Sequence, residues 1–137
     1  MSDPELLPVP GGSRERFYPV DCVVAAIASA EDAAAVTFEL RKAGFSNDTS
    51  RVISGVDLLT RHQAFLDRRS IDERFAPKPY GMDQDIEDAY LAAARDGAHV
   101  AVVRAPAEEL RGRVRRILIE HGGAQVRFYR QTGVEDL

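Results

Sequence analysis

The feature that most constrains the fold of this chain is a pattern that occurs twice. The segments VVAAIASAED, residues 23–32, and VAVVRAPAEE, residues 100–109, share it at an offset of 77 residues. Each copy begins as an apolar strand and passes through small residues into a helix with an acidic start. A glycine and a second strand follow each helix. Because a doubled βαβ unit is the pattern of the ferredoxin-like sandwich, the sequence predicts an α+β fold of the type βαββαβ.

The first copy predicts a strand, a helix and a short strand. The run from Val20 to Ala28 has the continuous apolar character of a central strand covered on both faces. Ser29 followed by Asp32 is typical of a helix start, because the serine side chain can accept from a backbone amide three residues later. Gly44 is placed where the helix would end. The short strand is expected over Arg51 to Ser54.

The second copy ends in the stretch IEHGGAQV, residues 119–126. A histidine beside two glycines could be a base or an anion site, or only the end of a helix. The end of a helix is the favoured interpretation, because anions prefer the N-terminus of a helix and this is a C-terminus. We therefore expect Gly122 or Gly123 to end the helix. The strand from Gln125 to Arg130 then alternates, with Val126 and Phe128 on one side.

Residues 55–97 separate the two copies, where a plain ferredoxin-like fold would need only a hairpin. Two apolar helical faces in this segment predict a two-helix insertion between the second and third strands, with a charged, proline-bearing loop between the helices. Residues 1–16 carry prolines and glycines without apolar periodicity and are expected to form a disordered tail. Residues 17–137 are expected to form a single domain.

Composition and net charge argue against several kinds of partner and site. A net charge of −4 argues against nucleic acid as a partner. The single cysteine, Cys22, excludes an internal disulfide and a cysteine-rich zinc site, and it is expected to be a small buried apolar residue. No signal peptide and no membrane span are predicted, so the expected location is the cytoplasm.

The residues VVAAIASAEDAAAVTFELRKAGF, DIEDAYLAAARDGAHVAVVRAP and ILIEHGGAQV together resemble the bacterial general-stress or heat-induced stress-protein domain family. The resemblance covers about Val20 to Arg130. It departs at Gly122 and Gly123, where the family more often has one glycine followed by alanine. It implies an α+β sandwich, a bacterial cytoplasmic location and dimerisation. It implies no established reaction and provides no catalytic residue.

No motif for phosphate loops, zinc proteases, serine hydrolases or calcium loops is present, so no catalytic residue, metal ligand or cofactor is predicted. The basic run RGRVRR, residues 111–116, is best interpreted as a solvated helix face, since a phosphate site would need its arginines to converge. If a ligand binds, the candidate groups are arginines and tyrosines of the loop and of the strand ends. They are Arg68, Arg69, Arg74, Tyr80, Arg104, Arg127 and Tyr129.

Two apolar residues, Phe38 and Ile119, fall on the outer sides of their helices, which suggests that either the inserted helices or a second chain covers them. The open face of the predicted sheet also needs a cover. We therefore expect a homodimer, since the isologous dimer is the commonest soluble oligomer. Its expected contacts are Phe38, Gln125, Arg127 and Tyr129.

The leading hypothesis is a non-enzymatic, stress-associated domain that acts through homodimerisation and protein binding. The alternative is a small-molecule or nucleotide-sensing regulatory domain, which rests on analogy with ferredoxin-like dimers that hold effectors between subunits. An enzyme of unrecognised type ranks third, because no nucleophile–base pair or carboxylate pair can be assigned from spacing.

Overall fold

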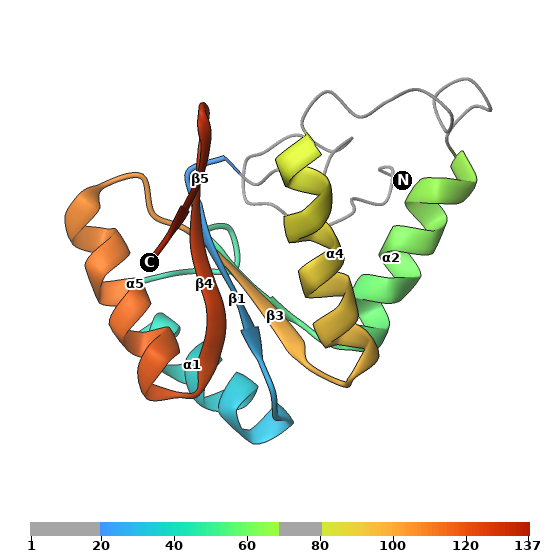
Figure 1. Ribbon diagram of the computed structural model, residues 1–137. Coiled ribbons are helices and arrows are strands. Elements are labelled where there is room, and N and C mark those ends of the chain that lie inside the picture. Colours follow the sequence, from blue (N-terminus) through green and yellow to red (C-terminus); the bar gives the residue numbers. More distant parts are fainter. Residues whose placement is uncertain (1–19, 69–80) are drawn as a thin grey trace.

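The fold is built on one antiparallel sheet of five strands, as a computed structural model of the chain shows (Figure 1). The structure describes residues 20–68 and 81–137, and the side chains of 20–63 and 88–137. The strands are β1 (Cys22–Ile27), β2 (Ser50–Ile53), β3 (His99–Arg104), β4 (Gly123–Arg130) and β5 (Gly133–Asp136). Their order in the sheet is β2-β3-β1-β4-β5. The α+β class predicted from the sequence is therefore confirmed.

The sheet has one strand more than predicted. The four expected strands lie in the order β2-β3-β1-β4, and β5 extends this sheet beyond β4. Residues 133–136 carry no apolar alternation, so the sequence did not predict a strand there. Tertiary contacts explain why a strand forms there. β5 pairs with β4 through the turn at Gln131 and Thr132, and this pairing places Glu135 and Asp136 beside arginines of β4.

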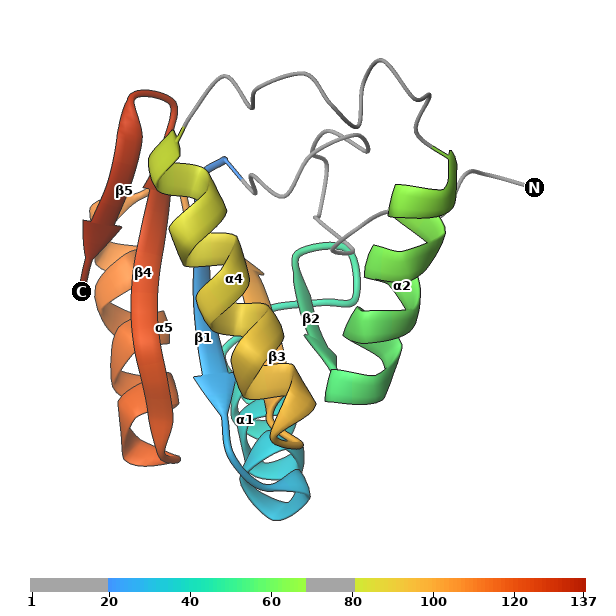
Figure 2. The same cartoon turned by 45° about the vertical axis from the view of Figure 1, so that its right-hand side comes forward.

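Helices cover both faces of the sheet. The described helices are α1 (Ala30–Lys42), α2 (Gly55–Arg68), α4 (Gly81–Arg95) and α5 (Glu108–Glu120). In Figures 1 and 2 the sheet separates α1 and α5 from α2 and α4. The two helices of residues 55–97, α2 and α4, thus lie on the face that was expected to stay open for a second chain. That expectation is corrected, since the chain covers much of this face itself.

Two apolar cores follow from the alternation of side chains along the central strands. Between the sheet and α1 and α5, the core includes Val23, Val36, Val103, Leu118 and Phe128. Between the sheet and α2 and α4, it includes Val24, Leu58, Tyr90, Val102 and Tyr129. Because β1 and β3 contribute to both cores, their side chains are apolar on both faces, as the continuous apolar runs predicted.

The start of α1 and the end of α5 follow the sequence patterns. Ser29 is the N-cap of α1, and its hydroxyl accepts from the backbone amide of Asp32 at 3.1 Å. After α5, Gly122 has a φ of +75°, the left-handed conformation that glycine adopts without strain. Gly123 is needed for another reason, because a Cβ there would lie 2.7 Å from the carbonyl oxygen of Leu118. The stretch IEHGGAQV is thus a helix stop in which both glycines have structural roles.

Candidate functional site

A bulge in β4 brings backbone groups of the sheet into contact with a side chain from α4. Between the pairs Val24–Arg127 and Ala26–Ala124, β4 has one residue more than β1. Within this bulge Gln125 has a φ of +53°, a left-handed conformation that is unfavourable for a residue with a Cβ. Such bulges re-aim backbone groups, and here the carbonyl of Gln125 meets the side chain of Tyr90 from α4.

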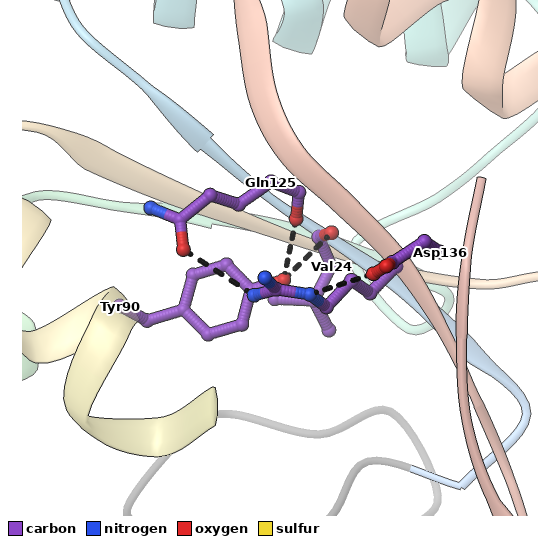
Figure 3. A network of polar contacts seen from close by, with 5 residues as sticks. Val24, Tyr90, Gln125 and Asp136 are labelled. Carbon is purple, nitrogen blue, oxygen red and sulfur yellow. Dashed lines mark hydrogen bonds and ion pairs between the residues drawn. The ribbon is translucent and has the colours of Figure 1, made fainter. Parts of the chain in front are cut away.

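The hydroxyl of Tyr90 donates to backbone carbonyl oxygens at the bulge. Its hydroxyl lies 2.6 Å from the carbonyl oxygen of Gln125 and 3.2 Å from that of Val24 (Figure 3). Burial, more than any other influence, raises the pKa of Tyr90, so the phenol stays protonated and acts as a donor. The contact ties α4 to β1 and to the irregular part of β4.

Arg127 completes this cluster, and its side chain lies on the face of β4 that α4 covers. Its Nε donates to Asp136 Oδ1 at 3.0 Å, its Nη1 donates to Gln125 Oε1 at 3.3 Å, and its guanidinium lies 5.7 Å from the ring centroid of Tyr90. Burial lowers the pKa of Arg127, but the hydrogen bond that Arg127 donates to Asp136 and the proximity of Tyr90 outweigh it and raise the pKa overall. The cation therefore stays charged and joins β4 to β5.

The Tyr90–Arg127 cluster supplies a neutral donor and a permanent cation, and neither is a nucleophile or a general base. Most of the polar atoms are already engaged within the chain. The arrangement is therefore suited to holding α4, β4 and β5 together. Tyr90 was not among the predicted ligand groups, because a partner 35 residues away leaves no signal in local spacing.

The structure places the other predicted ligand groups as follows. Tyr129 is fully buried on the face of the sheet that α4 covers. Arg104 lies opposite Cys22 at the end of β3, and β1 separates its strand from that of Arg127. The side chain of Arg68 and the whole of Arg69, Arg74 and Tyr80 lie outside the described residues. The structure thus joins Arg127 with Gln125, and the ligand-binding role of this set stays a prediction.

The predicted dimer contacts fall on different sides of the molecule. Phe38 lies on the outer side of α1 with 62% of its surface exposed. Arg127 and Tyr129 face the opposite side of the sheet, toward α4. Four residues split by the sheet in this way cannot form one continuous surface. The helical period placed Phe38 correctly on the outer side of its helix, but local periodicity does not indicate on which side of the sheet that helix packs.

A groove between α1 and α5 brings basic residues together. Its volume is about 270 Å³, and it is lined by Glu39, Lys42, Ala43, Arg113, Arg116 and Ile117. Lys42 contacts Glu39 at 3.8 Å, and both side chains are substantially exposed. Arg113 and Arg116 were expected to lie on a solvated helix face, and no pattern in the sequence singled out Lys42. The signal was non-local, since only the packing of α1 beside α5 makes the three cations converge.

Cys22 is buried, and burial raises the pKa of its thiol from 9.0 to about 12. A thiol held in its protonated form is a poor nucleophile and a poor metal ligand. Among the described side chains, those of residues 20–63 and 88–137, no group of three His, Cys, Asp or Glu residues has an arrangement that could hold a metal ion. Within residues 20–68 and 81–137, no helix has the length and apolar character needed to cross a membrane.

Comparisons with known proteins add no relative. No family model, no curated protein and no solved structure matches the chain.

Proposed function

We propose that the chain is a non-enzymatic, stress-associated bacterial domain that acts by binding protein, and that its first partner is a second copy of itself. The association with stress and with the bacterial cytoplasm rests on the family resemblance. The ferredoxin-like assignment is part of the same proposal. It is supported by the order β2-β3-β1-β4 within the sheet and by helices that follow β1 and β3 on one face.

The outer side of α1 carries the proposal. Its stripe, defined as Glu31, Ala34, Ala35, Phe38 and Lys42, falls within an arc of about 100° of the helix surface. Most of these side chains are exposed, and Phe38 is 62% exposed. The stripe has an acid at one end, small residues and an aromatic in the middle, and a base at the other end.

Such a stripe is complementary to itself when two copies run antiparallel. An isologous contact across the middle of α1 brings Glu31 of one copy near Lys42 of the other, because the two residues lie about equally far from the centre. Phe38 then packs on the small side chains at positions 34 and 35 of the partner. A helix of 13 residues is about 20 Å long, so the area is small and the dimer should be weak.

Sedimentation velocity on the full chain at increasing concentration tests the proposal. We expect a monomer–dimer equilibrium that Phe38→Asp abolishes, because an unpaired carboxylate would be buried at the centre of the contact. Val56→Asp is the matched control, since Val56 on α2 is 76% exposed but lies on the other face of the sheet. A chain that stays monomeric throughout, or two variants that weaken the dimer equally, would contradict the proposed contact.

A further inference from the structure

We propose that the groove between α1 and α5 binds a small phosphate-bearing anion. Lys42 reaches it from α1, and Arg113 and Arg116 reach it from α5. Arg113 and Arg116 are three residues apart, so they project from the same side of α5. The proposal rests on this groove, which shares only Lys42 with the proposed dimer contact, so Arg113 and Arg116 carry the site in the monomer and in the dimer alike.

The charge of the groove indicates the class of ligand. Its three cations and the carboxylate of Glu39 leave a net charge of +2. This charge complements a phosphate monoester, which carries about −1.5 to −2 at neutral pH, better than it complements a monocarboxylate. Arginine forks match phosphate oxygens in pairs, and lysine adds a mobile point charge.

Lys42 is available for such a ligand. Its contact with Glu39 is long, at 3.8 Å, and is formed between exposed side chains, so it contributes little and is easily replaced. The ammonium group of Lys42 also lies 5.4 Å from the ring centroid of Phe38, and Lys42 lines the groove.

The size and lining of the groove favour a small molecule. The groove is open, and its volume of about 270 Å³ lies just below the roughly 300–1,000 Å³ of typical ligand pockets, so a compact organic phosphate fits it better than a larger ligand. Ala43 and Ile117 provide an apolar part of the lining against which the organic portion could pack. A nucleic acid would need a far longer basic surface, and the overall charge of −4 disfavours one.

The test is a titration of the full chain with glycerol phosphate, followed by NMR of the arginine side-chain N–H groups and by calorimetry. We expect saturable binding at moderate ionic strength, with shifts at Arg113 and Arg116. Replacing either arginine with glutamine should weaken binding about tenfold, the effect of losing one charge-assisted hydrogen bond. Glu39→Gln should strengthen binding, because it removes the competing carboxylate.

Arg115→Gln is the matched control, since Arg115 is an exposed neighbour that does not line the groove. Equal weakening by Arg115→Gln, equal affinity for acetate, or no saturable binding of glycerol phosphate would overturn the proposal. The titration is repeated at protein concentrations below and above the monomer–dimer transition, so that a failure of the dimer and a failure of the anion site are separate results. If inorganic phosphate binds saturably and glycerol phosphate does not, the proposal that the ligand is an organic phosphate is wrong.

Discussion

At the scale of single residues, close approach between backbones decides which side chains the chain tolerates. Gly55 begins α2 where that helix meets the end of α4. A Cβ at this position would lie 2.5 Å from the carbonyl oxygen of Ala94 and 2.7 Å from that of Ala98. The backbone of α4 cannot yield as a flexible side chain would, so glycine is required for the two helices to pack.

We therefore expect Gly55→Ala to destabilise the fold by about 2 kcal/mol or more, as overpacking against fixed atoms does. Gly112 is the control, because it lies in α5 with open space around its Cα. There Gly112→Ala should stabilise the protein by about 0.5–1 kcal/mol, since alanine restricts the unfolded chain and favours the helix. Urea denaturation of both variants measures the two effects. If both variants change the free energy of unfolding in the same direction, this prediction is wrong.

Because the thiol of Cys22 is buried, the free energy of unfolding is expected to depend on pH. Burial raises its pKa from 9.0 to about 12, so above pH 9 the unfolded chain releases a proton that the folded chain retains. The contribution to stability is thus fully present below pH 9 and is lost as pH rises toward 12. The slope approaches about 1.4 kcal/mol per pH unit.

Urea denaturation between about pH 8 and pH 9.5 should show the start of this loss in the wild-type chain, below the ordinary pKa values of tyrosine and lysine, which are about 10 and 10.4. Cys22→Ala should be less stable at neutral pH because it leaves a small cavity, but its stability should vary less over the same range. Parallel pH profiles for the two proteins would show that Cys22 is not the titrating group.

At the scale of elements, the bulge of β4 combines strain with a specific contact. Gln125 holds a left-handed φ of +53°, and its carbonyl accepts from Tyr90. Its side-chain amide meets Arg127 at 3.3 Å, which is a long hydrogen bond. The backbone geometry, more than the side chain, therefore positions this residue.

Comparing Gln125→Ala with Gln125→Gly separates these contributions. Alanine removes the side-chain contact but keeps the Cβ, so a loss of about 0.5–1 kcal/mol is expected. Glycine removes the same contact and also relieves the left-handed strain, so the glycine variant should be about 1 kcal/mol more stable than the alanine variant. Thermal denaturation of the pair measures this difference, and an alanine variant at least as stable as the glycine variant would rule the strain out.

At the scale of the whole molecule, the two cores share one sheet. β1 and β3 contribute side chains to both faces, so neither layer of helices can leave without exposing strands that the other layer needs. Unfolding is therefore expected to be cooperative across both faces.

Leu58→Ala and Leu118→Ala test this on opposite faces, since both leucines are fully buried. Each should cost about 2–5 kcal/mol, and each should lower a single transition. The readout is circular dichroism at two wavelengths during thermal denaturation. Two separate transitions in either variant would mean that the layers unfold independently.

Local pattern was sufficient for much of the fold. The repeat at 77 residues predicted β1, β3, α1 and α5, because strand and helix periodicity act over a few residues. Ser29 as a cap and Gly122 as a helix stop followed from the same short-range chemistry. The candidate sites were far less predictable: Arg127 was named as a ligand group, but Tyr90, Lys42 and the convergence of Lys42 with Arg113 and Arg116 were not.

The sequence by itself determined the elements and the apolar character of the central strands. Only the tertiary structure decided that α2 and α4 cover the face expected for a partner, that β5 joins the sheet, and that Phe38 and Tyr129 lie on opposite sides of it. The physical reason is the range of the interactions. Periodicity and capping are set by neighbours within a turn or two, whereas layer, sheet edge and groove depend on contacts between residues far apart in the chain.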